Sequence, residues 1–177
     1  SDSVALLRIL LEITDNKIYV VHVNHQLRES AKDDERFVLD LCDSLDVPCK
    51  VYSFDVSAKA SEMKRSLEDV GRILRYQAFE DYQAELFGEN YKEKSVICVA
   101  HHKDDIAETM LMNLFRGTGA EGLVSPKAKS ENVIRPLICV SKSELTDYLN
   151  SISHMISFPF YPSYNIQIAS LLFLLAN

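Results

Sequence analysis

The stretch at residues 95–109 constrains the fold of this chain more than any other. A short apolar run, Ser-Val-Ile-Cys-Val-Ala, stops at His101, His102, Asp104 and Asp105. Apolar residues at helical spacing follow at once. The stretch therefore predicts a strand, a polar corner and a helix. In such an arrangement the end of the strand and the start of the helix meet at the carboxyl edge of a sheet, where open α/β proteins bind their ligands.

The polar residues at this corner have two interpretations. Asp104 and Asp105 stand where carboxylates cap a helix, but capping needs one of them at most. His101 and Asp105 are four residues apart, and Asp105 and Glu108 are three apart. In a helix that starts early these groups share one face and converge on a cation or a phosphate. The alternative is a capped helix with solvated charges.

Strand and helix patterns alternate through most of the chain. Strands are predicted at residues 17–24, 49–54 and 95–100, with a short extended element at 133–137. Helices are predicted at residues 4–11, 30–45, 61–86, 104–116 and 141–149, the last opened by the capping box Ser-Lys-Ser-Glu at 141–144. The alternation predicts an α/β fold with a mostly parallel sheet and helices on both faces.

Length and charge limit the classes of function. A chain of 177 residues that is 47% apolar can bury one sizeable core. Its formal charge of -7 argues against electrostatic capture of nucleic acid by the chain as a whole, so an RNA contact requires a local basic patch.

Cysteines and apolar runs indicate the compartment. The four cysteines form no C-x-x-C pair and are expected to be reduced thiols in a cytoplasmic protein. No apolar run is long enough to cross a bilayer, so no membrane association is expected. The chain lacks an initiator Met, and its first residue is not expected to be a natural start. Residues 151–177 carry no charge and fit a docking segment, an interface helix or an irregular terminus.

Three motifs occur together in order along the chain. Asp2-Ser3 opens the first helix, Asn-His-Gln-Leu-Arg follows a strand at 24–28, and Ala-His-His-Lys-Asp-Asp-Ile-Ala-Glu-Thr follows another at 100–109. In this order and spacing the chain resembles the N-type ATP pyrophosphatase (PP-loop) family, and within it the tRNA(Ile)-lysidine synthetases. Further matches lie at 67–76, 116–119 and 135–137. The resemblance covers residues 1–150 and implies a Rossmann-like, adenine nucleotide alpha hydrolase-like fold for them, with residues 151–177 outside it.

The resemblance implies a reaction, its cofactors and its partners. In this family ATP adenylates C2 of the wobble cytidine of tRNA(Ile) and pyrophosphate leaves. The amine of free L-lysine then displaces AMP to give lysidine. The implied cofactors are ATP and Mg²⁺, and the implied partners are tRNA(Ile) and lysine; the sequence does not indicate an oligomeric state.

The resemblance also implies roles for individual residues. Asp2 corresponds to a catalytic ligand of the magnesium on the triphosphate, and Ser3 to a phosphate contact. Asp105 corresponds to an acid that assists magnesium or the cytidine, while Asp104 is expected mainly to cap its own helix, so that Asp104→Asn is milder than Asp105→Asn.

Basic residues complete the implied nucleotide site. His25 and Arg28 would line the adenosine or triphosphate, and Arg72 and Arg75 would offset charge on phosphate or tRNA. For the arginines a solvated helix face is the alternative interpretation.

One part of the family pattern is missing. The PP-loop has the form Ser-Gly-Gly-x-Asp-Ser, of which only Ser1-Asp2-Ser3 is present. Because bare backbone N–H groups at a helix start hold the phosphates, we expect weak ATP binding until the upstream glycines are restored. A non-catalytic or truncated nucleotide-binding domain, and a PP-loop synthetase with another substrate, are the alternatives.

Two metal centres are disfavoured by the sequence. Adjacent histidines rarely point into one site, and no second His or Cys pair has ligand spacing, so His101 and His102 do not predict zinc. The absence of C-x-x-C argues against the iron–sulfur tRNA thiolases of the same superfamily.

Overall fold

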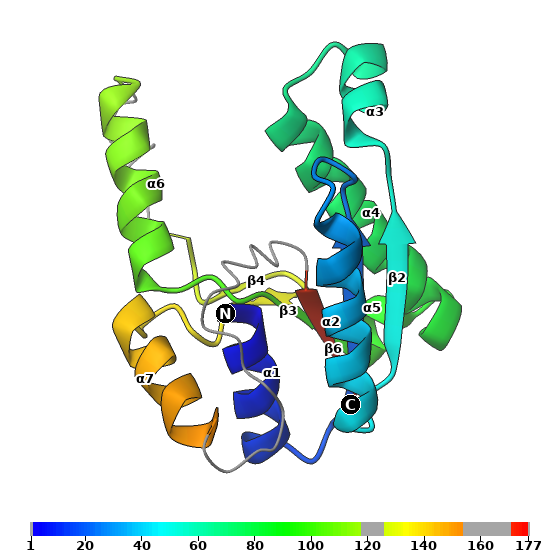
Figure 1. The fold of residues 1–177 in the computed structure, drawn as a ribbon, viewed down its shortest axis with the longest axis vertical. Coiled ribbons are helices and arrows are strands. Elements are labelled where there is room, and N and C mark those ends of the chain that lie inside the picture. The colour runs from blue at the N-terminus through cyan, green and yellow to red at the C-terminus, as the bar shows by residue number, and fades with distance from the viewer. Residues whose placement is uncertain (1, 118–125, 154–170, 177) are drawn as a thin grey trace. The chain divides into compact units, whose positions relative to one another are not determined.

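The computed structural model of the chain (Figure 1) describes residues 2–117, 126–153 and 171–176. The chain divides into two compact units. Unit 1 comprises Ser1–Thr14 and Cys98–Gln167, and unit 2 comprises Asp15–Ile97 and Ile168–Asn177. Each unit is described by itself.

The sheet of unit 2 is built around β1 (Lys17–Asn24). It pairs in parallel with β2 (Cys49–Ser53), with Val20 opposite Cys49. On its other side β1 pairs antiparallel with β6 (Leu171–Ala176), and the strand order is β2, β1, β6, β3, where β3 is Ser95–Cys98. The parallel β1–β2 pair confirms the predicted α/β fold. Strand β6 was not predicted, and the rest of the uncharged segment, residues 154–170 and 177, lies outside the described residues.

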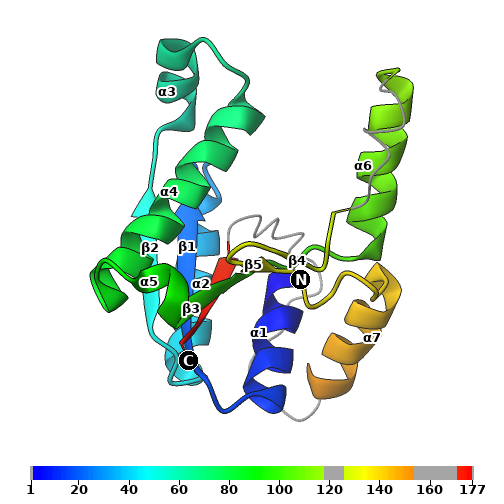
Figure 2. The same ribbon diagram turned by 180° about the vertical axis from the view of Figure 1, so that it is seen from behind.

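Helices cover both faces of β1. Figures 1 and 2 show α2 (Ala31–Ser44) in front in one view and α4 (Leu67–Phe87) in front in the other. Val20 and Val21 point to opposite faces of the strand, and both are fully buried. This double coverage explains the continuous apolar run from which the strand was predicted.

The helix predicted at residues 61–86 is two helices. Helix α3 (Val56–Met63) ends where Lys64 takes a left-handed conformation with φ of 52°. Helix α4 then begins after Ser66, whose hydroxyl accepts the backbone N–H of Asp69 at 3.1 Å. The prediction of one helix was wrong because this cap, rather than the apolar spacing, sets the boundary. A four-residue helix, α5 (Tyr91–Lys94), precedes β3.

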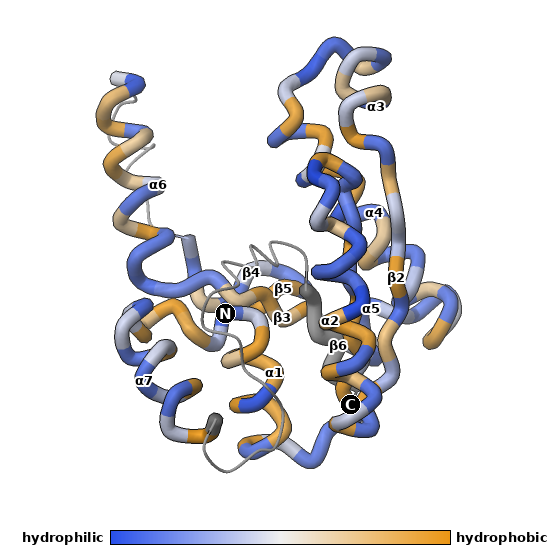
Figure 3. Tube along the Cα trace, viewed as in Figure 1, coloured by the Kyte–Doolittle hydropathy of each residue, from blue (hydrophilic) through white to orange (hydrophobic). Residues whose placement is uncertain are grey.

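Unit 1 contains α1 (Asp2–Ile13), α6 (Lys103–Phe115) and α7 (Lys142–Ser153), and these three predicted helices are confirmed. Helix α1 contacts α7 and buries Leu6 and Leu7, and Figure 3 shows the concentration of apolar residues along it. The short strands β4 (Lys129–Ser130) and β5 (Val133–Ile134) pair antiparallel. Val99, which directly follows β3, donates its N–H to the carbonyl of Ile134 in β5 at 3.1 Å.

Helix α6 differs from its prediction in one respect. Its apolar residues do not form a buried stripe, since no residue of the helix is buried and Phe115 is 85% exposed. Within the described ranges, no helix combines the length and apolar character that crossing a membrane requires.

Candidate nucleotide site

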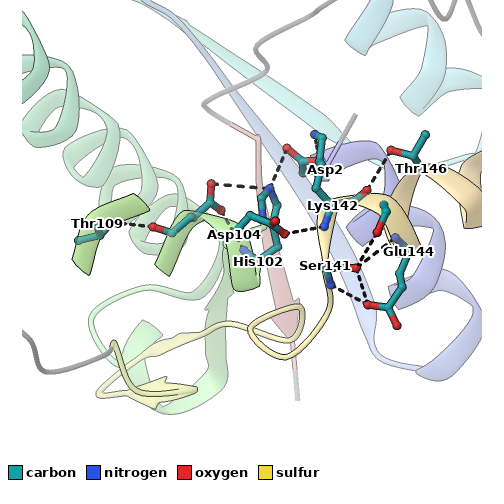
Figure 4. A network of polar contacts seen from close by, with 10 residues as sticks. Asp2, His102, Asp104, Thr109, Ser141, Lys142, Glu144 and Thr146 are labelled. Carbon is teal, nitrogen blue, oxygen red and sulfur yellow. Dashed lines mark hydrogen bonds and ion pairs between the residues drawn. The ribbon is translucent and has the colours of Figure 1, made fainter. Parts of the chain in front are cut away.

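Three helices of unit 1 start at one place. Helix α1 begins at Asp2, α6 at Lys103 and α7 at Lys142. Lys142 Nζ donates a hydrogen bond to Asp2 Oδ1, and Asp104 Oδ2 accepts the backbone N–H of Lys142 at 2.7 Å (Figure 4). The first N–H of α6, that of Lys103, is likewise accepted by the carbonyl of Val140 at 2.9 Å. Each helix start is the positive end of a helix dipole, so three of them together favour an anion.

The start of α7 is fixed by its capping box. Glu144 Oε2 accepts the backbone N–H of Ser141 at 2.8 Å and its hydroxyl at 2.6 Å, and Ser141 Oγ accepts the N–H of Glu144 at 3.3 Å. These hydrogen bonds from Ser141 lower the pKa of Glu144. The predicted capping box is therefore confirmed, and it holds the backbone of Lys142 in place.

His102 lies at the centre of the cluster. Its side chain is only 7% exposed. Its Nε2 lies 3.6 Å from Asp2 Oδ2 and 3.6 Å from Asp105 Oδ1, and its Nδ1 lies 3.6 Å from Asp104 Oδ2. The buried Nδ1 makes no hydrogen bond to any group in the described part of the chain. A buried polar atom in this state marks a place where a further polar group fits.

Asp2 keeps its negative charge in this cluster. Burial alone would raise its pKa, but chiefly the hydrogen bond and the positive charge of Lys142 bring the pKa below its usual value. The Asp2 carboxylate is therefore ionised at neutral pH, and Lys142 is its counter-ion.

The two aspartates of the corner have other partners than predicted. Asp105 Oδ2 accepts the backbone N–H of His102 at 2.9 Å and so closes the start of its own helix, α6. Asp104 was expected to do this, but it binds the first N–H of α7 instead. The expectation for Asp104 was wrong because its partner lies 38 residues further along the chain. Helix α6 starts after His101, so the proposed shared helical face of His101 and Asp105 is not formed.

Sequence reasoning missed His102 and Lys142 as site residues. For Lys142 the sequence did contain an indication: a cation at the first position of a helix is disfavoured by the helix dipole and needs a compensating acid. Nothing in the sequence identified that acid as Asp2, which is 140 residues away.

A second group of predicted residues lies in unit 2. A Cβ added to Gly71 would stand 2.9 Å from His25 Cε1 and 3.0 Å from its Nδ1, so the glycine allows the imidazole to lie against α4. Burial, followed by the charges of Arg75 and His22, lowers the pKa of His25, which is therefore neutral at pH 7. The Nε of Arg75 is buried and makes no hydrogen bond within the described residues, and burial lowers the pKa of the guanidinium.

The remaining predicted arginines have protein partners. Arg28 forms an ion pair with Asp34 at 2.9 Å, although its side chain is 47% exposed. The guanidinium of Arg72 lies 5.3 Å from the ring centre of Tyr76. Asn24 shapes the turn before Arg28, because its Oδ1 accepts the N–H of Gln26 at 2.9 Å.

The residues of unit 1 fit a magnesium ion that arrives with a nucleotide. Among the residues that the structure describes, no group of three His, Cys, Asp or Glu side chains could hold a metal alone. Mg²⁺ binds through one or two carboxylates together with water and substrate phosphates, so a closed protein cage is not required. The ionised Asp2, with Asp105 close to the same imidazole, supplies carboxylates of this kind.

Comparison with known proteins gives a family and several relatives. The PP-loop domain family matches this chain over residues 1–158. The chain is 41% identical over 152 residues to a tRNA(Ile)-lysidine synthase of Caldanaerobacter subterraneus, with 84% of this chain and 31% of that protein covered. It is 39% identical over 153 residues to one of Bacteroides thetaiotaomicron, with coverages of 86% and 34%. For one of Chlorobaculum tepidum the identity is 38% over 154 residues, with coverages of 84% and 44%. The chain thus spans 31% to 44% of the length of these relatives.

A solved structure shares the fold. It is the U34-tRNA thiolase NcsA from Methanococcus maripaludis with its [4Fe-4S] cluster, with a TM-score of 0.66 over 96% of this chain and 59% of that one. The sequence identity is 15%, so the likeness concerns the fold alone.

Proposed function

The chain belongs to the PP-loop domain family, and on this premise we propose that residues 1–150 are the ATP-binding and adenylating part of a tRNA(Ile)-lysidine synthase. ATP would transfer its adenylyl group to the C2 oxygen of the wobble cytidine, with cleavage of the α–β phosphoanhydride bond and release of pyrophosphate. The amine of free lysine would then attack C2, and AMP would leave. The proposed compartment is the cytoplasm, where tRNA(Ile) and lysine are available.

The meeting of three helix starts in unit 1 carries this proposal. Backbone N–H groups and helix dipoles at the starts of α1, α6 and α7 favour the negative charge of a triphosphate. The buried Nδ1 of His102, which makes no hydrogen bond in the described part of the chain, adds a polar atom at the same place. Ser3, which is buried one residue into α1, is the proposed phosphate contact predicted from the sequence.

The carboxylates have a proposed role with the metal. Asp2, and Asp105 beside it, would hold Mg²⁺ that enters with ATP. The ion would offset charge on the phosphates. Asp105 also fixes the start of α6 through the N–H of His102, so its substitution disturbs both the charge and the position of the helix.

The His25–Arg75 group of unit 2 is proposed to bind the nucleoside or the tRNA phosphates. The lowered pKa of His25 leaves a neutral imidazole, which can stack on a base or share a hydrogen bond with it. The Nε of Arg75, which is buried and makes no hydrogen bond to the described residues, is suited to a phosphate or carbonyl oxygen. Arg28 and Arg72 are weaker candidates, because each already contacts a side chain of the protein.

The proposed function is tested by pyrophosphate release from ATP. We would compare the chain with a variant that carries Ser-Gly-Gly before Ser1, which completes the PP-loop pattern, and with a Ser-Ala-Ala control. Release should require both tRNA(Ile) and lysine for a full turnover, should increase with the glycine extension, and should fall in Asp105→Asn. Release that ignores tRNA and Asp105 would contradict the proposal, while ATP binding without any release would favour a non-catalytic nucleotide-binding domain.

A further inference from the structure

Lys142 has an unusual position for a lysine. It is the first residue of α7, where the helix dipole disfavours a positive charge. Its ammonium is directed to Asp2 at the start of α1 (Figure 4), and its own backbone N–H is bound by Asp104. The backbone of Lys142 is thus fixed by a capping box and a carboxylate, whereas the end of the side chain forms an ion pair with Asp2.

That ion pair is suited to exchange. The side chain of Lys142 is 44% exposed and that of Asp2 is 29% exposed. Partly exposed ion pairs contribute little net stability, so a stronger anion can displace the carboxylate. The ammonium group of lysine is compact, has three hydrogen-bond donors and is attached to a flexible chain. It can therefore change its direction while the backbone stays in place.

The surroundings favour a phosphate as the competing anion. A nucleotide at the three helix starts would bring several negative charges beside the Asp2 carboxylate, which Lys142 contacts in this structure. When no metal is bound to Asp2, its carboxylate repels the phosphates. The ammonium of Lys142 would reduce the negative charge of the phosphates if it contacted them. On cleavage of the α–β bond, the negative charge that builds on the departing pyrophosphate would be stabilised by a cation placed there beforehand.

We propose that Lys142 pairs with Asp2 in the nucleotide-free chain and turns to the phosphate oxygens when a nucleoside triphosphate binds. There it contacts the β- and γ-phosphates and stabilises pyrophosphate as it leaves. Lys142 gives up no proton in this step, because the α–β bond breaks with its electron pair on the pyrophosphate oxygen. The inference rests on the proposed ATP site and adds to it a catalytic residue that lies outside the three motifs on which the family resemblance rests.

The test measures which part of the nucleotide depends on Lys142. Binding of ATP, pyrophosphate and adenosine would be measured by calorimetry for the chain with the Ser-Gly-Gly extension and for Lys142→Gln and Lys142→Arg. The glutamine variant should bind ATP and pyrophosphate at least about tenfold more weakly, because a hydrogen bond to a charged group contributes about 1.5–3 kcal/mol. Its affinity for adenosine should be unchanged, and the arginine variant should retain most of the affinity.

Lys103→Gln is the matched control, since Lys103 is the exposed first residue of the neighbouring helix α6. It should affect pyrophosphate binding less than Lys142→Gln does.

In a second experiment, pyrophosphate binding by Asp2→Asn would be measured in the absence of magnesium. By removing the competing carboxylate it should leave pyrophosphate binding as tight as in the parent or tighter, whereas a purely structural Asp2–Lys142 pair predicts weaker binding of every ligand.

The outcomes separate the inference from the proposed function. Unchanged ATP and pyrophosphate affinity in Lys142→Gln, or an equal loss for adenosine, would overturn the inference alone. A parent that binds no ATP would overturn both. In a third outcome, the affinity for pyrophosphate depends on Lys142 while the rate of pyrophosphate release from ATP is the same with and without tRNA and lysine. That combination would support the inference and contradict the lysidine assignment.

Discussion

The polar clusters of the two units differ in how their charges are compensated. In unit 1 the acidic residues have partners: Lys142 binds Asp2, and the N–H of His102 binds Asp105. In unit 2 the cationic group is less well compensated, because the Nε of Arg75 is buried without a hydrogen bond in the described residues and burial lowers the pKa of both Arg75 and His25.

The difference indicates how each cluster would bind. The unit 1 cluster must exchange an existing ion pair for the ligand, whereas in the unit 2 cluster the ligand can bind the Nε of Arg75, which has no hydrogen bond within the described residues. Substitutions in unit 1 are therefore expected to act mainly on nucleotide chemistry. In unit 2 a substitution that disturbs the packing of His25 is expected to act on stability, and one that removes Arg75 is expected to act on binding.

The largest expected effect comes from the acids of unit 1. Asp105→Asn should lower tRNA-dependent pyrophosphate release by about 100-fold, the usual cost of removing one group that stabilises charge in a transition state. Asp104→Asn should lower it less than about tenfold, because the asparagine oxygen can still accept the N–H of Lys142. Single-turnover rates measure both; equal losses would show that the two acids are not distinguished as proposed.

In unit 2 the largest expected effect is on folding. Alanine usually stabilises a helix relative to glycine by about 1 kcal/mol. Gly71→Ala should do the opposite and destabilise by about 1–3 kcal/mol, because its methyl group would overlap His25. Urea unfolding measures the change, and the double variant with His25→Ala should recover part of the loss. A stabilised Gly71→Ala would show that the close packing of His25 is absent.

The two clusters should also respond at different pH. The pKa of His25 and of His22 is lowered, mainly by burial, so the unfolded chain takes up protons first and stability should fall as the pH drops below about 6.5. The pKa of Asp2 is also lowered, so its contribution should persist at this pH and be lost only below 3.8.

Unfolding free energies at pH 7.5, 6.0 and 5.0 would measure this dependence. His25→Gln should flatten the curve, and Asp2→Asn should leave its slope unchanged in that range. A stability that does not change between pH 7.5 and 5.0 would contradict the assignment of neutral histidines to unit 2.

The smallest expected effect is that of Arg75→Met. Since the buried Nε of Arg75 makes no hydrogen bond among the described residues, replacing the side chain with an apolar one should change the free energy of unfolding by less than about 1 kcal/mol. Nucleotide or tRNA binding should nevertheless weaken. A loss of several kcal/mol in unfolding would show that Arg75 is a structural residue.

Local patterns predicted most of the fold. The apolar runs of β1 and β2, the capping box of α7 and the first helix were readable because each depends on neighbours in sequence. The break between α3 and α4 was missed although Ser66 and Asp69 form a readable cap. Strand β6 was not predictable, since its uncharged apolar sequence has no local strand signal and forms a strand by pairing with β1.

The site was predicted less completely than the fold. The motifs identified Asp2 and Asp105, and the structure brings both within 3.6 Å of His102. The contacts of Asp104 and Asp2 with Lys142 join segments 38 and 140 residues apart, and no periodicity or cap in the sequence encodes them.

The central claim is that a triphosphate binds at the three helix starts of unit 1. The most direct measurement is the change in backbone amide NMR shifts of the Ser-Gly-Gly-extended chain on titration with a non-hydrolysable ATP analogue, compared with adenosine. We predict triphosphate-dependent shifts at Ser3, Lys103 and Lys142 that adenosine does not produce. Shifts confined to unit 2, with those three amides unchanged, would contradict the claim.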